Sequence, residues 1–192
     1  MIAATISDYL TDEDSENAGL VARMLTESYM RKPSLEDKAM RGIMEFVGSR
    51  YFAEIADDRN QDSLCAFAVV FMFRGKARWV TGGGSMVYHF EDGQLVRYSQ
   101  CIDAPPLGEK EQYEVELEDA FQLSGGKNAF LLCSKEMAKQ TPPELLERTL
   151  QDAETPEQWL QNIVAEIGEA RQFCANAVFL PQKRTFGKWG RK

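Results

Sequence analysis

The stretch that decides the fold is residues 130–137, which read Phe-Leu-Leu-Cys-Ser-Lys-Glu-Met. Together with Ala129, the first four residues form a short apolar run, and such a run predicts a buried strand. Lys135 follows almost directly after the end of that run. The sequence therefore places the positive charge of Lys135 at the end of a buried strand, and a charge beside an apolar core requires a structural or functional reason.

Several β-rich segments precede this strand. They cover residues 64–73, 77–81, 86–90 and 95–98. Residues 74–76 (Arg-Gly-Lys) and 91–94 (Glu-Asp-Gly-Gln) separate some of them, and both predict hairpin turns, since glycine and the Asp-Gly pair tolerate positive φ. The pattern predicts an antiparallel meander. Residues 2–7 and 175–180 add a first and a last strand.

Helices are expected in two pairs. Apolar residues at helical spacing predict one helix over 15–31 and a longer one that begins at Ser34 as its N-cap. After the central strand, Thr141-Pro142 and Thr155-Pro156 each predict a Thr cap followed by proline at the first helical position. This order of elements favours an α+β fold with antiparallel sheets covered by helices over a parallel βαβ fold.

Composition indicates one domain and disfavours some partners. The 192 residues suit a single core, which we expect over residues 1–181, and the basic tail 182–192 is expected to be mobile. A formal net charge of -8 opposes long-range attraction to nucleic acid or to anionic lipid.

The sequence also predicts a cytoplasmic protein. Its longest apolar run, residues 64–73, is about half as long as a membrane-spanning helix requires, and no signal segment is recognisable at the start. The four cysteines stand singly and lack the spacing of zinc ligands, so we expect reduced cysteines that fill the core.

Three segments resemble the PPM family, the metal-dependent type 2C serine/threonine protein phosphatases. They are residues 66–98, 128–150 and 173–180, and the motifs that carry the resemblance are Gly82-Gly83-Gly84-Ser85 with Asp92-Gly93, residues 130–137 and residues 173–178. Residues 2–8 also resemble the strand that leads to one of the family's metal-binding aspartates, which places Asp8. The resemblance implies an α/β/β/α sandwich of two antiparallel sheets flanked by helix pairs. Nothing here matches the family's first strand pair, so we expect a divergent member that lacks the first strands.

The resemblance also implies a site, and that site is degenerate. The family's carboxylates hold two Mg²⁺ or Mn²⁺ ions, which activate water to attack phosphoserine or phosphothreonine. Gly84, Lys135 and Phe173 occupy three of the acidic positions, and only Asp8 falls on a metal-ligand position. We therefore expect no catalytic residue and no cofactor.

Two interpretations of Lys135 follow. In one, its ammonium group replaces the metal and forms an ion pair with Asp8, which holds the sheets together. In the other, Lys135 opens a loop and points into water, while Asp8 is a polar strand end. The residues leave both interpretations open.

The leading functional hypothesis is a non-catalytic phosphatase-like protein, or pseudophosphatase, that binds or regulates a partner protein. The alternative is a divergent Mg²⁺- or Mn²⁺-dependent phosphatase with ligands drawn from Asp8, Asp12 and Asp14. A homodimer through an exposed sheet edge is a third possibility, because open edges pair readily.

Other candidates have plainer interpretations. Residues 82–84 predict a turn or bulge, since they lack the Lys-Ser/Thr of a phosphate loop. His89 is expected to be a surface or half-buried strand histidine without a catalytic role, and the acidic residues between 109 and 119 a solvated strand or loop. The basic, aromatic tail has a composition able to contact nucleic acid or an acidic protein, with a solvated terminus as the default.

Overall fold

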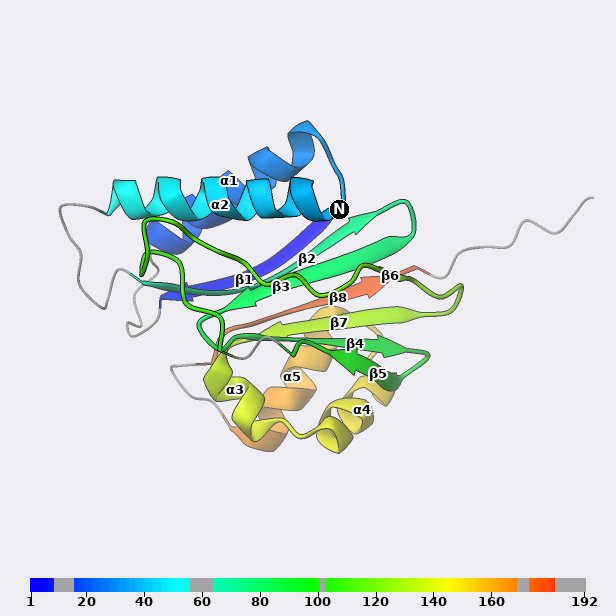
Figure 1. The fold of residues 1–192 in the computed structure, drawn as a ribbon. Helices are drawn as coiled ribbons and strands as arrows, with labels where there is room; N and C mark the ends of the chain where they lie inside the picture. Colours follow the sequence, from blue (N-terminus) through cyan, green and yellow to red (C-terminus); the bar gives the residue numbers. More distant parts are fainter. Residues whose placement is uncertain (9–15, 56–63, 101–102, 169–172, 182–192) are drawn as a thin grey trace, which may run out of the picture.

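The computed structural model describes residues 1–8, 16–55, 64–100, 103–168 and 173–181, apart from the side chains of Ser7, Asp8 and Glu16 (Figure 1). The expected tail 182–192 lies outside these residues. The elements in chain order are β1 (Ile2–Asp8), α1 (Glu16–Arg31), α2 (Asp37–Glu54), β2 (Cys65–Phe73), β3 (Lys76–Gly82), β4 (Met86–Glu91), β5 (Gln94–Tyr98), β6 (Phe121–Gln122), β7 (Asn128–Cys133), α3 (Lys135–Gln140), α4 (Pro143–Gln151), α5 (Pro156–Ile167) and β8 (Ala175–Leu180).

The strands form two antiparallel sheets that pack face to face. The first sheet has the order β1-β2-β3-β6 and the second the order β5-β4-β7-β8. Helices α1 and α2 cover the outer face of the first sheet, and α4 and α5 cover that of the second (Figure 1). The expected α+β sandwich of two antiparallel sheets flanked by helices is confirmed.

The central strands are apolar because both of their faces are buried. In β2, Phe67, Val69 and Phe71 pack against the helices, whereas Ala68 and Val70 face the other sheet. Every residue of β7 is buried as well. Alternate residues of one strand therefore belong to different layers of the core, as the period of two requires.

Each helical layer is fixed by a large aromatic residue with a hydrogen bond. The Tyr29 hydroxyl of α1 donates to the Met72 carbonyl of β2 over 3.0 Å. In α5, the Trp159 ring meets Phe90 edge-on at 5.2 Å, and its Nε1–H donates to the Leu146 carbonyl. These hydrogen bonds give the buried O–H of Tyr29 and N–H of Trp159 a partner, while the rings themselves bury a large apolar area.

Two of the predicted helix starts are wrong. Helix α2 begins at Asp37 and not after Ser34, because the buried guanidinium of Arg78 binds the Leu35 carbonyl and the Asp37 carboxylate and so holds the preceding segment extended. Thr141 ends α3, and its hydroxyl donates to the Met137 carbonyl. The Thr155 cap is confirmed, since its hydroxyl accepts the Gln158 N–H.

Other features differ from the expectation too. The short helix α3 and the two-residue strand β6 were not predicted. His89 is fully buried, whereas a surface or half-buried position was expected. The reason is that β4 lies inside its sheet with helices on one face and the first sheet on the other, so all its residues except Glu91 are buried.

The sheet edges bear on the expected homodimer, which stays a prediction. Strand β1 is at one edge of the first sheet and β8 at one edge of the second. The two edges are adjacent, because the Asn176 amide donates to the Ala4 carbonyl over 3.1 Å. Among the described residues, no helix has both the length and the apolar character needed to cross a membrane.

Two glycines of α2 give a matched test of the packing. A Cβ at Gly48 would lie 2.3 Å from the Tyr113 Cβ, whereas a Cβ at Gly42 would meet open space. We expect Gly48→Ala to lower the free energy of unfolding by roughly 1–3 kcal/mol through overpacking. Gly42→Ala should raise it by roughly 0.5–1 kcal/mol, because alanine loses less backbone entropy in a helix. Urea unfolding measures both, and similar effects of the two substitutions would contradict the contact.

Candidate functional site

Two of the degenerate ligand positions lie against each other. Gly84 follows β3 in the turn toward β4 and has φ of +80°, and a Cβ there would lie 2.7 Å from the Lys135 Cδ. Lys135 is exposed and is the first residue of α3, so it begins a helix and does not open a loop. The aliphatic part of the lysine thus covers the backbone at the position where the family resemblance places an aspartate.

The third position has become part of the core. Phe173 precedes β8 and is partly buried against the apolar cluster between the second sheet and its helices. A carboxylate there would lose part of its hydration without gaining a partner from that cluster, which is unfavourable for a charged group. An apolar ring therefore fills the space where a metal ligand is expected.

The backbone of Asp8 reaches the same end of the sandwich. Asp8 is the last residue of β1 and pairs with Cys65 at the start of β2, and the next β2 residue, Ala66, contacts Gly83. The side chain of Asp8 lies outside the described residues, as do Asp12 and Asp14 entirely. The proposed ion pair of Asp8 with Lys135 therefore stays a prediction.

This set of residues does not fit a pair of divalent cations. Hard cations such as Mg²⁺ and Mn²⁺ take several oxygen ligands, and carboxylates offset the cost of their dehydration. Gly84, Lys135 and Phe173 offer no carboxylate, and Lys135 adds a positive charge. Within the part of the chain that the structure describes, no three His, Cys, Asp or Glu side chains lie close enough together to hold a metal ion.

The adjacent cysteine is not a nucleophile either. Cys133 is buried at the end of β7, and burial, with a smaller contribution from nearby Cys174, raises the pKa of its thiol to about 12. The reactive form of a cysteine is the thiolate. At neutral pH Cys133 is therefore a protonated core residue, as expected for the single cysteines.

Comparison with known proteins gives a consistent answer at the level of fold. No family model matches the chain, and no curated protein matches it. Several solved structures, however, match the chain. PppA, "a key regulatory component of T6SS in Pseudomonas aeruginosa", aligns with a TM-score of 0.70 at 16% identity over 93% of this chain and 85% of its own. This chain has the fold of the PPM phosphatases.

Further structures with the PPM fold support the assignment. A bacterial serine phosphatase aligns with a TM-score of 0.73 at 10% identity, over 95% of this chain and 87% of its own. The catalytic domain of the serine/threonine protein phosphatase PstP, solved with two manganese ions, aligns with a TM-score of 0.67 at 13% identity, over 94% of this chain and 98% of its own.

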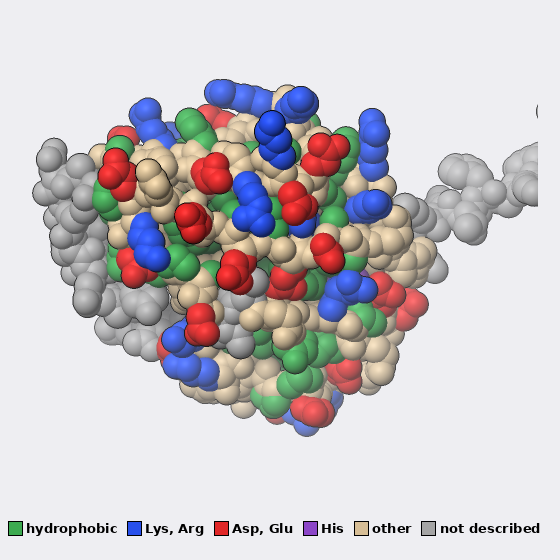
Figure 2. Space-filling view, viewed as in Figure 1, with side chains coloured by type: hydrophobic (Ala, Val, Ile, Leu, Met, Phe, Trp, Pro, Cys, Tyr) green, Lys and Arg blue, Asp and Glu red, His purple; other side chains and the backbone are tan. Residues whose placement is uncertain are grey.

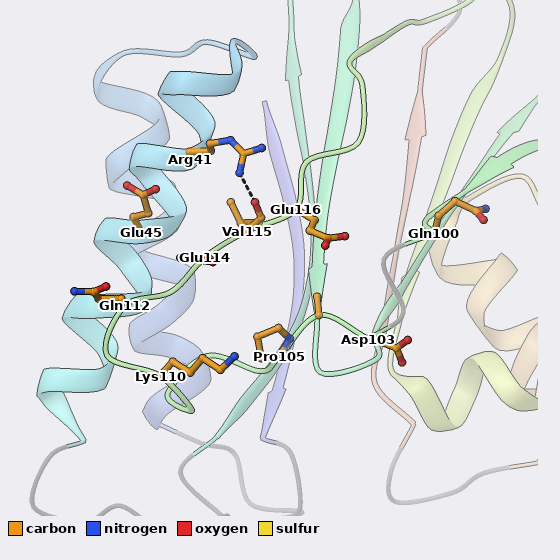
Figure 3. A pocket seen from close by; sticks show the side chains of 11 residues that line it. Arg41, Glu45, Gln100, Asp103, Pro105, Lys110, Gln112, Glu114, Val115 and Glu116 are labelled. Atoms are coloured by element: carbon orange, nitrogen blue, oxygen red, sulfur yellow. Dashed lines mark hydrogen bonds between the residues drawn. The ribbon is translucent and has the colours of Figure 1, made fainter.

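A groove beside the degenerate positions is the second candidate site on the PPM fold. It has a volume of about 940 Å³ and lies between α2 and the long connection from β5 to β6 (Figure 3). Ala104 and Pro105 form part of its lining, and the Ala104 carbonyl accepts the Gly83 N–H over 2.8 Å. The groove therefore adjoins the turn that carries Gly84.

The wall of the groove is held in place although it has no regular structure. Tyr113 and Val115 are buried, and the Tyr113 hydroxyl donates to the Pro105 carbonyl over 2.8 Å. Arg41 of α2 donates to the Val115 carbonyl over 2.6 Å (Figure 3). These contacts hold residues 105–115 of the connection against α2.

The lining is polar and mainly acidic. Figure 3 shows Glu45 on α2, Glu114 and Glu116 along the connection, and Asp103 on the far side. Arg41 and Lys110 are the basic residues of the lining. Figure 2 shows acidic side chains across the middle of this face, with lysine and arginine side chains among them. The groove is therefore suited to a positively charged ligand.

The exposed acidic residues on one side of the groove were predicted from the sequence. The alternating acidic residues between 109 and 119 indicated a solvated strand or loop, and Glu114 and Glu116 are indeed exposed. The burial of Tyr113 and Val115 between them was missed. It depends on Gly48, which leaves room for Tyr113 on a helix far away in sequence.

Restoring an acid at Gly84 tests the geometry of this turn. We expect Gly84→Asp to lower the free energy of unfolding by roughly 1–2 kcal/mol, because a side chain at positive φ is strained. Gly125→Asp is the control, since a Cβ there meets open space. It adds the same charge and should change stability by less than roughly 0.5 kcal/mol. A free energy of unfolding equal to that of wild type would contradict the strained turn. An increase of that free energy on addition of Mn²⁺ would show that the turn can hold a metal ligand, which would also contradict our description.

Proposed function

We propose that this protein is a non-catalytic member of the PPM fold that binds a partner protein. The observation that carries the proposal is the contact of Lys135 with Gly84, at two positions where the family resemblance places metal ligands. A single lost acid would leave a damaged site. Here a lysine and a partly buried ring occupy the places of the acids, which favours a scaffold used for binding.

The groove is the surface that we propose for the partner. It has defined walls, and its carboxylates from Glu45, Asp103, Glu114 and Glu116 outnumber its bases. A segment of the partner rich in lysine or arginine would complement this charge. PppA, which shares the fold, is described as a regulatory component, and this supports a regulatory role for the present chain.

We also propose that the protein works in the cytoplasm. Among the described residues, Cys65, Cys133 and Cys174 form no disulfide bond. Proteins of reducing compartments keep their cysteines in this state.

The alternative is a divergent metal-dependent phosphatase. Asp8, Asp12 and Asp14 follow one another closely in sequence, and their side chains lie outside the described residues. If all three converged on one ion, a reduced metal site would be possible despite the loss of the other acids. This alternative is tested directly by activity.

The first experiment measures phosphate release from a phosphothreonine peptide with Mn²⁺ or Mg²⁺. We expect no turnover above the rate without protein, because the carboxylates needed to hold two ions are absent at three positions. A folded PPM phosphatase serves as the positive control. Metal-dependent turnover that Asp8→Asn abolishes would overturn the non-catalytic proposal and establish the alternative.

The second experiment tests the groove with a defined probe, a ten-residue peptide rich in lysine and arginine. Calorimetry compares wild type with Glu45→Gln/Glu114→Gln in the groove and with Glu144→Gln/Glu157→Gln on exposed positions of α4 and α5. Both double variants remove the same net charge. We expect the groove variant alone to lose at least about fivefold in affinity, since only its charges face the peptide. Equal losses would show attraction to the net charge alone and would contradict the groove.

A further inference from the structure

His89 lies between the two sheets, and it is the sole histidine of the chain. Its side chain on β4 is fully buried. The imidazole stacks on Phe130 of β7 with ring centroids 4.5 Å apart and an angle of 14°. Its centroid is also 5.1 Å from that of Phe121 on β6, which belongs to the other sheet. His89 therefore contacts both sheets at once.

The hydrogen bonds of Asn128 determine which ring nitrogen of His89 carries the proton. The Asn128 Nδ2 donates to the carbonyls of Ser124 and Gly126, so its Oδ1 must be the atom that faces His89. That oxygen lies 3.0 Å from Nε2 of His89. An amide oxygen only accepts hydrogen bonds. Neutral His89 therefore has its proton on Nε2 and a bare lone pair on Nδ1.

A second proton on the His89 ring would bind Nδ1, and the resulting N–H would have no hydrogen-bond acceptor among the described residues. The Nδ1 atom is buried and has no hydrogen-bond partner in the described part of the structure. Two charged groups influence the ring: the Glu91 carboxylate, whose Oε1 is 4.0 Å from Nε2, and the Arg97 guanidinium, which lies over Phe121 at 4.3 Å. The other contacts, from β6 and β7, are uncharged. Burial is the largest effect, and it lowers the pKa of His89.

The contacts of His89 connect the short strand β6 and the residues after it to the second sheet. Strand β6 joins the first sheet through only two residue pairs, Lys76 with Gln122 and Ala77 with Phe121. The connection that follows it is held by Asn128 through the Ser124 and Gly126 carbonyls. Phe121 and Asn128, which both help to attach this segment to the second sheet, contact the His89 ring. Further attachments are the two hydrogen bonds between Asp92 and Lys127 and the Arg97 guanidinium over the Phe121 ring.

We propose that His89 is a proton-sensitive latch, which holds β6 and residues 123–127 against the second sheet while neutral and releases them when protonated. Protonation leaves Nδ1–H buried without an acceptor and places a cation near Arg97. Both changes favour an open state in which water reaches the ring. Because β6 directly follows the connection that forms the groove wall, the latch also controls one end of that wall.

The direction of the pH dependence follows from linkage. In the open state His89 has an ordinary pKa of about 6.5, and in the closed state a lower one. Below about pH 6.5 the open state therefore binds more protons, and opening increases as the pH falls until the closed-state pKa is reached. Over that interval, the equilibrium constant for opening rises by up to about tenfold per pH unit.

Nuclear magnetic resonance of the full chain tests the latch directly, because the one histidine gives an unambiguous signal. We expect ¹⁵N shifts of the Nε2–H tautomer at pH 7 and a titration midpoint below that of a free histidine. Hydrogen exchange, corrected for the intrinsic rate, should lose protection in residues 121–128 on going from pH 7 to pH 5, while β2 stays protected.

His89→Gln separates the latch from a general effect of acid. Glutamine retains an N–H donor for Asn128 and does not titrate. In this variant, the protection of residues 121–128 should therefore be the same at pH 5 and at pH 7. The same pH dependence in wild type and variant would overturn the proposal. If the variant does not fold, the wild-type signal still decides, since a midpoint at or above that of free histidine, or the Nδ1–H tautomer, contradicts the latch.

Discussion

The burial of the central strands on both faces is the constraint on which the rest of the structure depends. Strands β2 and β7 are covered by helices outside and by the opposite sheet inside. They have no face on which polar side chains reach water, so chemistry on this scaffold is confined to strand ends and connections. Gly84, Lys135 and Asp8 all lie at such places, which is why changes there leave the core intact.

At the strand ends, the replaced residues contribute to packing. Lys135 covers Gly84, and Phe173 extends the apolar cluster of the second sheet. The connection from β5 to β6 lies against the same turn through the bond from Gly83 to the Ala104 carbonyl. A fold that elsewhere supports hydrolysis thus presents here a shaped, acidic groove beside a filled site. Fold alone never assigns function, and binding is what we propose for the residues at this site.

The sequence predicted features that depend on neighbours along the chain. The strands, their hairpin turns and the Thr155 cap are local patterns, and they are confirmed. The start of α2 was missed because Arg78, distant in sequence, binds the segment before it. His89 was misplaced because its burial comes from strands on two sheets. The resemblance identified Gly84 and Lys135 separately, and the glycines predicted the turn, but the contact also depends on where α3 begins relative to that turn, which no local pattern encodes.

We propose that the phosphatase fold persists here without a two-metal centre. Electron paramagnetic resonance, recorded while Mn²⁺ is added to the protein, tests this proposal, since bound ions lose the sharp signal of the free ion. We expect the free signal to grow in proportion to added Mn²⁺ at micromolar concentrations, as it does with buffer alone. Loss of signal corresponding to two tightly bound ions per chain, abolished by Asp8→Asn, would contradict it.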